Sequence, residues 1–260
     1  MRALSIALSV VVLFLICAPV QAQWVKVPPK NIPRTPDGKV NMSAPAPKTA
    51  DGAPDLSGVW EMARSYVGNI AADLKEELPY QPATRALVDQ RKTGAHANED
   101  PPAHCLPQGI PRLDSAPAPW RVIQTPGYIA ILYEAFGLWR QIFTDGRELA
   151  KEVNPTWLGY STGKWEGDTL VVETRGFNGE AWMDQMGRPT SESTRVIERI
   201  HRKDYGHMDF QITIDDPKLY TRPWTVNQSA RLADPNLDLM EYVCVDKDLG
   251  HLPGSSFSLK

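Results

Sequence analysis

The sequence predicts an all-β protein, a sandwich or barrel of antiparallel strands with a short helix and a proline-rich N-terminal arm. Three observations support this fold class. Segments rich in β-branched and aromatic residues recur at short intervals from residue 120 onward, turn sequences with glycine separate them, and helical periodicity is rare. The 260 residues contain no internal repeat, which disfavours a propeller.

About ten segments have the length and residue types of a strand. We expect strands at residues 59–62, 121–124, 128–135, 138–143, 159–165, 169–174, 194–202, 207–214, 225–232 and 237–244. Short turn sequences such as Thr125-Pro126-Gly127 join several of them, so neighbouring strands should pair in antiparallel fashion.

The chain begins with the pattern of a secretory signal peptide, predicted at residues 1–22. Arg2 precedes an apolar stretch that ends in small residues, and the expected cleavage follows Ala22. A lipoprotein anchor at Cys17 is the less favoured alternative, because the bulky Ile16 stands where such sites have a small residue. We therefore expect an exported protein, most simply a periplasmic one.

The remaining chain divides into three predicted parts. Residues 23–53 are rich in proline and should form an extended arm or linker. Residues 54–246 should form the β-barrel domain, with a helix near residues 81–92 that starts at Pro82. Residues 247–260 should form a flexible C-terminal tail.

The charge of the chain restricts its partners. The net charge is −3 and no long basic run is present, so nucleic acid is not an expected partner. After the signal, no apolar run approaches the length of a membrane span, so stable membrane insertion is not expected. A small apolar or weakly charged molecule fits this composition, and a homo-oligomer is compatible with it.

Two cysteines remain after the predicted cleavage, Cys105 and Cys244. In an oxidising compartment two cysteines favour a bridge, so we predict a Cys105–Cys244 disulfide. Their wide separation makes a poor zinc signature, and we expect no metal site and no cofactor. The mature chain lacks a Cys-x-x-Cys motif, a dinucleotide glycine fingerprint and a His-Glu-x-x-His motif.

Several motifs carry a resemblance to known proteins. The segment "DLSGVW" at residues 55–60 resembles the Gly-x-Trp opening strand of the calycin barrels, the lipocalin and avidin superfamily. The segments "GYSTGKWEGDTLVVETRGF" at 159–177, "CLPQGIPR" at 105–112 and "DDPKLYTRPW" at 215–224 resemble a group of secreted bacterial proteins, mostly without assigned function. The resemblance implies an exported, calycin-like antiparallel barrel, and it implies no particular activity.

The strand at 207–214 shows the clearest alternation in the chain. Its even-numbered residues are apolar and its odd-numbered residues are polar, so Met208 and Phe210 should point into the barrel. As interior side chains they are candidate contacts for a bound apolar molecule.

The preceding strand supplies the candidate catalytic residues. If the turn consists of residues 203–206, Arg202 pairs with His207, and Arg199 and His201 then face the interior. A buried guanidinium and imidazole would need partners or a function. A bulge of one residue would instead turn both side chains to solvent, and that alternative stays open.

The long connection at residues 178–193 is the second candidate. Long loops in compact β proteins often cover binding sites, so Trp182 could close over an apolar ligand and Asp184 could act as acid or base. In the structural alternative, Trp182 plugs the barrel end and Asp184 caps a turn.

Further candidates come from the hairpin around residues 134–140 and from the aromatic residues. Glu134 and Arg140 flank a turn, where a surface cross-strand ion pair is the default and a binding role for Arg140 is the alternative. Most large rings must belong to the core, but Tyr133 and Tyr160 are candidates for lining a pocket.

These observations lead to a functional hypothesis with two competitors. We expect an apolar or aromatic molecule in the lumen and a cofactor-independent lyase or isomerase step. His201 or Asp184 would move a proton and Arg199 would stabilise negative charge. A carrier or sensor would bind the same molecule without reaction, and an envelope scaffold would have a lumen filled by side chains.

Overall fold

The structure, a computed structural model, describes residues 31–244. The predicted signal peptide at 1–22, its cleavage site after Ala22, the first part of the arm and the predicted tail at 247–260 lie outside the described residues. Of the described residues, those from Ile32 to Cys244 belong to one compact unit. Within the described part of the chain, no helix combines the length and apolar character that crossing a bilayer would require.

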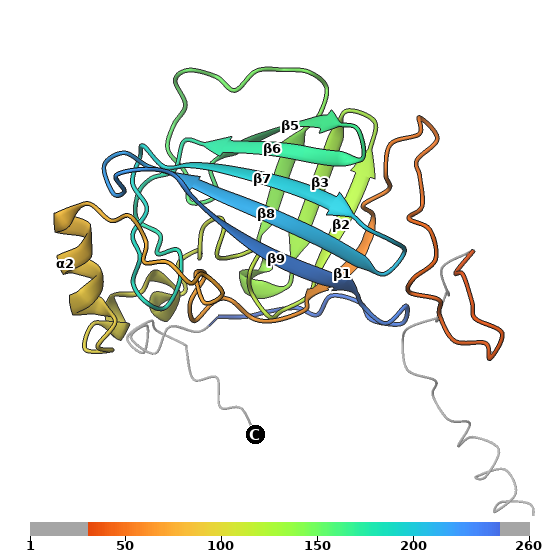
Figure 1. Cartoon of the computed structure of the whole chain (residues 1–260), viewed down its shortest axis with the longest axis horizontal. Helices are drawn as coiled ribbons and strands as arrows, with labels where there is room; N and C mark the ends of the chain where they lie inside the picture. Colours follow the sequence, from red (N-terminus) through yellow and green to blue (C-terminus); the bar gives the residue numbers. More distant parts are fainter. Residues whose placement is uncertain (1–30, 245–260) are drawn as a thin grey trace, which may run out of the picture. The chain divides into compact units, whose positions relative to one another are not determined.

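Nine strands form one closed barrel, in which each strand pairs with the next and β9 pairs with β1 (Figure 1). This confirms the predicted all-β fold with a short helix. The strands are β1 (Gly58–Met62), β2 (Trp120–Thr125), β3 (Tyr128–Tyr133), β4 (Trp139–Phe143), β5 (Tyr160–Glu166), β6 (Thr169–Arg175), β7 (Arg195–Arg202), β8 (His207–Asp215) and β9 (Trp224–Leu232). The helices are α2 (Pro82–Arg91) and the 3₁₀ turns η1 (Ala97–Glu99), η2 (Pro101–His104) and η3 (Ala135–Gly137).

The barrel is antiparallel at every strand pair except one. β4 and β5 run parallel, because the connection at residues 144–159 returns the chain to the other end of the barrel before β5 begins. This junction, called the seam below, is held by the pairs Ile142↔Ser161 and Phe143↔Thr162 alone. The fully antiparallel barrel that the sequence predicts is therefore corrected to a mixed one.

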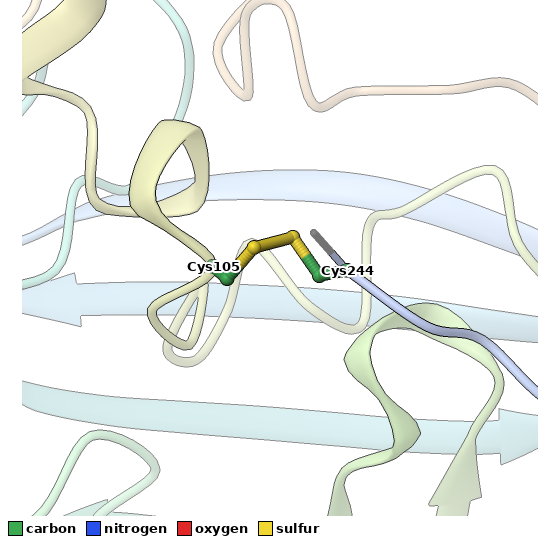
Figure 2. Close-up of a disulfide and its surroundings, with 2 residues drawn as sticks. All are labelled: Cys105 and Cys244. Carbon is green, nitrogen blue, oxygen red and sulfur yellow. A yellow bond between two sulfur atoms is a disulfide. The ribbon is translucent and has the colours of Figure 1, made fainter. Parts of the chain in front are cut away.

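The strand expected at residues 237–244 does not form. Both edges of β9 are already occupied, by β8 on one side and β1 on the other, so no edge remains for a further strand. The segment instead follows the outside of the barrel, where the Met240 N–H donates to the Glu134 carboxylate at 2.8 Å. The predicted disulfide is confirmed, since Cys244 is bonded to Cys105 (Figure 2).

The β7–β8 turn is one residue longer than predicted. Arg202 pairs with Met208 rather than with His207, and the Lys203 N–H donates to the His207 carbonyl at 3.0 Å. The N-terminal arm supports the longer turn, because the Gly206 N–H donates to the Met42 carbonyl at 2.8 Å. The change reverses the two faces of β7.

The inner face of β7 consequently carries a different set of side chains from the predicted one. The buried residues of β7 are Val196, Glu198, Ile200 and Arg202. The interior position expected for Arg199 and His201 is therefore wrong. Arg202 can occupy the barrel end because backbone carbonyls, including that of Tyr205 at 2.5 Å, accept its hydrogens.

The alternation of β8 is as predicted. Met208, Phe210, Ile212 and Ile214 are buried and join one core cluster, whereas the odd-numbered residues are more exposed. The arm lies at the barrel end that holds the β2–β3 and β7–β8 turns, and α2 lies at the other end (Figure 1). The arm and α2 therefore lie at opposite ends of the barrel.

Candidate functional site

The seam between β4 and β5 opens into a cleft in the barrel wall. Beyond the Ile142↔Ser161 pair the two strands separate, and the space between them is a cleft of about 450 Å³. This volume lies in the range that small-molecule sites occupy. The residues that line this seam cleft are Pro107, Leu138, Trp139, Arg140, Gln141, Phe143, Thr156, Trp157, Leu158, Gly159, Tyr160 and Ser161.

Aromatic side chains form much of the cleft wall. Trp139 is 59% exposed and Tyr160 is 39% exposed, although both are large rings. Both lie on the outer face of their strands, whereas Arg140 and Ser161 lie on the inner face. The seam cleft therefore brings exposed rings and buried polar groups into one site.

The far wall of the cleft is fixed by backbone hydrogen bonds. The Thr156 N–H donates to the Gly176 carbonyl at 2.9 Å, and the Tyr160 hydroxyl donates to the Asn154 carbonyl at 3.1 Å. Gly159 turns the chain into β5 with a φ of +66°, and a Cβ there would lie 2.7 Å from the Arg175 carbonyl. The glycine is thus required for the loop to approach β6 this closely.

The rim of the cleft comes from the proline-rich loop that follows η2. Pro107, two positions after Cys105, lines the cleft. The disulfide to Cys244 anchors this loop to the C-terminal segment that crosses the outside of the barrel (Figure 2). The predicted bridge therefore lies next to the site and supports its rim.

Arg140 and Ser161, on the inner faces of β4 and β5, form the floor of the cleft, and the Arg140 side chain is buried. Its Nε–H donates to the Ser161 hydroxyl at 3.1 Å, and Nη2 donates to the Thr174 hydroxyl at 2.8 Å. Nη1 donates to Asp114 at 3.0 Å and to Glu198 at 3.3 Å, and Nη2 also donates to Glu198. Arg140 thus joins β4, β5, β6, β7 and the proline-rich loop.

Two buried carboxylates share this single guanidinium. Asp114 accepts from Arg140 and from the Tyr133 hydroxyl, and Glu198 is paired with Arg140 on its other side. Burial raises the pKa of Asp114 from 3.8 to about 7, although the Arg140 charge opposes this rise. Burial also raises the pKa of Tyr133 far above its usual value, so its hydroxyl remains a donor. We call Arg140, Asp114, Glu198 and Tyr133 the buried cluster.

The barrel lumen itself is almost filled. It contains a cavity of about 20 Å³, bordered by Asp114, Arg140 and Glu198 and by apolar residues that include Met208 and Phe210. This volume holds about one water molecule and no aromatic ring. Trp120 also borders the cavity, and its indole N–H has no hydrogen-bond partner within residues 31–244. The lumen therefore has no room for the ligand that the sequence places there.

Arg199 and His201 lie on the outer face of the barrel. Arg199 forms an exposed ion pair with Glu166 at 2.9 Å, and Nδ1 of His201 lies 3.1 Å from the Asp168 carbonyl. Both residues border a shallow polar depression of about 440 Å³ on the outside of β6–β9. They are remote from the buried cluster because β7 directs them to the opposite side of the sheet.

Asp184 and Trp182 stabilise the barrel end that holds α2. Asp184 is fully buried, forms an ion pair with Arg188 and accepts the Ile70 N–H at 2.9 Å. Burial raises the pKa of Asp184, and Arg188 opposes the rise. Trp182 is buried with the Arg91 guanidinium 4.2 Å from its ring centre. The Asp184 carboxylate also accepts the Met186 N–H at 3.1 Å, so Asp184 caps a turn as the structural alternative expects.

The predicted surface ion pair between Glu134 and Arg140 does not form, because Arg140 points inward and Glu134 binds the Met240 N–H. Of the candidates, the structure brings Arg140 and Tyr160 into the cleft and Tyr133 directly behind it. Sequence reasoning missed Asp114, Glu198, Ser161 and Thr174. The alternation of inward and outward residues in β7 could have revealed Glu198 once the turn length was known. Asp114 lies in a loop, where no alternating pattern of side chains indicates which residues are buried.

No protein-family profile matches the chain, and no curated protein matches it. Residues 31–244 contain no group of three or more His, Cys, Asp or Glu side chains arranged to hold a metal ion. The seam cleft and the buried cluster behind it are therefore the features of this structure that bear on function.

Proposed function

We propose that the protein is a periplasmic carrier or sensor that binds a small, flat aromatic or apolar molecule in the seam cleft. The observation that carries this proposal is the exposure of Trp139 and Tyr160 in a cleft of about 450 Å³. Large exposed rings in a concave site are costly for solubility, and they are typical of binding surfaces. The Cys105–Cys244 disulfide is consistent with export to an oxidising compartment.

Binding without chemistry fits the composition of the cleft. Its lining contains no Asp, Glu or His, and its one charged side chain is the fully engaged Arg140. Aromatic stacking and apolar burial would supply the affinity, at about 25 cal/mol per Å² of apolar surface removed from water. The proposed binding site is thus the seam cleft, whereas the sequence-based expectation was the barrel lumen.

Acid–base conversion of the bound molecule is the second candidate, with different residues from those the sequence suggested. Asp114 has a pKa of about 7 and is therefore suited to exchange a proton at neutral pH. It lies behind Arg140, so a reacting atom would have to pass the guanidinium or use a water in the small lumen cavity. His201 and Asp184 have no part in this version.

A metabolite-capture experiment tests the proposal. The purified mature protein is incubated with an extract of apolar metabolites, and both bound and newly formed species are identified by mass spectrometry. A carrier retains an aromatic compound unchanged, whereas an enzyme yields a new compound that requires Asp114.

A pair of variants tests whether the molecule binds in the seam cleft. Trp139→Ala removes a ring of the cleft and should lower the affinity for the retained compound about tenfold. Ile123→Ala is the matched control, because Ile123 is also apolar and exposed on the barrel exterior but does not line the cleft. Retention of no compound, or equal loss in both variants, would contradict binding in the seam cleft.

A further inference from the structure

The Ser161 residue on the cleft floor indicates what kind of ligand the cleft accepts. We propose that the ligand carries a neutral acceptor oxygen, as an aromatic ketone or aldehyde does, and that the Ser161 hydroxyl donates a hydrogen bond to it. This inference rests on the proposed function and assigns it a ligand class and a specificity-determining residue.

Arg140 cannot supply the hydrogen bond to the ligand. A guanidinium has five N–H groups, and the structure gives five acceptor contacts for them. The acceptors are Ser161, Thr174, Asp114 and the two carboxylate oxygens of Glu198. No donor of Arg140 is left for a molecule in the cleft.

Thr174 determines the orientation of the Ser161 hydroxyl. The Thr174 oxygen accepts from Arg140 at 2.8 Å and lies 2.9 Å from the Ser161 oxygen. Thr174 is fully buried, and within the described residues 31–244 these are its side-chain partners. Either hydroxyl of this pair can donate to the other, and Ser161, at 2% exposed, is nearly as buried as Thr174. We infer that Thr174 is the donor, because Ser161 borders the seam cleft and Thr174 does not, so only the Ser161 hydrogen can find an acceptor in the cleft.

Ser161 is then left with one unused hydrogen. Its oxygen accepts from Arg140 at 3.1 Å and from Thr174 at 2.9 Å, which fills both acceptor positions of a hydroxyl. Because Ser161 lines the seam cleft and Thr174 does not, the remaining hydrogen is the one that a ligand can accept.

The charges behind the floor favour a neutral ligand. Arg140 is matched by two carboxylates, Asp114 and Glu198, so the buried cluster has no excess positive charge for an anion. A carboxylate or phenolate placed against Ser161 would approach this acidic pair. A carbonyl oxygen accepts the Ser161 hydrogen without that repulsion.

A matched pair of probes tests the inference on the mature protein with its disulfide intact. The probes are 2-acetonaphthone and 2-ethylnaphthalene, which have similar size and shape and differ in the carbonyl oxygen. Equilibrium dialysis of the wild-type protein should give about five- to tenfold tighter binding of the ketone. Ser161→Ala should abolish this preference.

Thr174→Val is the matched control, because it also removes one hydroxyl that accepts from Arg140. The Ser161 hydrogen remains available in this variant, so the ketone preference should persist. As a readout that needs no variant, the infrared carbonyl stretch of 2-acetonaphthone bound to the wild-type protein should shift to lower wavenumber than in hexane.

The outcomes separate the two proposals. If neither probe binds the wild-type protein, the proposed function itself is contradicted. If both probes bind equally, if Ser161→Ala keeps the ketone preference, or if the carbonyl stretch does not shift, binding in the cleft stands and the role of Ser161 is wrong. If Ser161→Ala does not fold, the affinity ratio and the infrared shift in the wild-type protein decide.

Discussion

Two neighbouring residues of β7 form ion pairs on opposite sides of the barrel wall. Glu198 pairs with Arg140 inside, where the side chains are 1% and 2% exposed. Arg199 pairs with Glu166 outside, where they are 42% and 51% exposed. The same chemical pairing thus occurs once in the core and once in solvent, displaced by a single residue along the strand.

This contrast shows that environment, rather than residue type, decides what an arginine–glutamate pair does. In water the outer pair has little net energy, because solvent and salt screen both charges. In the core the inner pair must be complete, since a buried charge without its partner is very unfavourable. The strand pattern alone predicts a functional role for the outer arginine, Arg199, whereas in the structure the inner arginine, Arg140, is the one that joins the neighbouring strands.

The largest effect should come from removing one arginine at a time. Arg140→Met leaves Asp114 and Glu198 buried without their cation, so we expect the free energy of unfolding to fall by about 3–5 kcal/mol. Arg199→Met should change it by less than about 1 kcal/mol. Urea denaturation of both variants measures the difference, and similar losses in the two variants would overturn the comparison.

The next largest effect should be a pH dependence that comes from Asp114 in the buried cluster around the inner pair. The pKa of Asp114 is raised from 3.8 to about 7 in the folded state, so between these values the unfolded chain has released the proton that the folded chain keeps. Stability should therefore be greatest near pH 4 and fall as the pH rises toward 7, by up to about 1.4 kcal/mol per pH unit.

Asp114→Asn serves as the control for this slope. Asparagine has a similar shape and does not titrate, so the wild-type excess slope between pH 4 and 7 should disappear in urea denaturation series. An unchanged slope would mean that the pKa of Asp114 is not raised in the folded state and that another titrating group causes the slope.

Removing the Trp139 ring should change the stability much less than removing Arg140, although it should weaken binding. Because Trp139 is 59% exposed, Trp139→Ala should alter the free energy of unfolding by less than about 0.5 kcal/mol. The same variant should weaken ketone binding about tenfold in equilibrium dialysis. A loss of stability as large as that of Arg140→Met would show that the ring is structural.

The smallest effect should come from His201, which lies on the outer face with Arg199. His201→Ala should leave both the affinity for 2-acetonaphthone and the stability unchanged within about 0.5 kcal/mol. Isothermal calorimetry and thermal unfolding measure the two quantities. A clear loss of affinity would instead indicate that the ligand binds in the outer depression on β6–β9.

The sequence predicted those parts of the fold that depend on local patterns. The alternation around Met208 and Phe210 and the turn chemistry between strands gave an all-β barrel, and the two cysteines gave the disulfide. Local patterns do not determine how many residues a turn consumes when another segment supports it. The β7–β8 turn, in which the Gly206 N–H donates to the Met42 carbonyl of the arm, is one residue longer than the local pattern predicts, and this exchanges every inward and outward position on β7.

The site was harder to predict because its parts are distant in sequence. Asp114 belongs to a proline-rich loop, and Arg140 and Glu198 come from β4 and β7. A parallel junction also cannot be read from turn sequences, since it depends on the path of a long connection. Residue type alone makes Arg140 and Tyr160 candidates, but the sequence does not show which side chains lie next to them in the fold.

The connection at residues 144–159 has a consequence for how such a protein could diversify. It builds the far wall of the seam cleft, yet it leaves β4 and returns to β5 where only two residue pairs join the strands. Insertions or deletions there would reshape the pocket while the other strand pairings keep the barrel closed. A homologue with a longer or shorter connection should therefore accept molecules of a different size on the same scaffold.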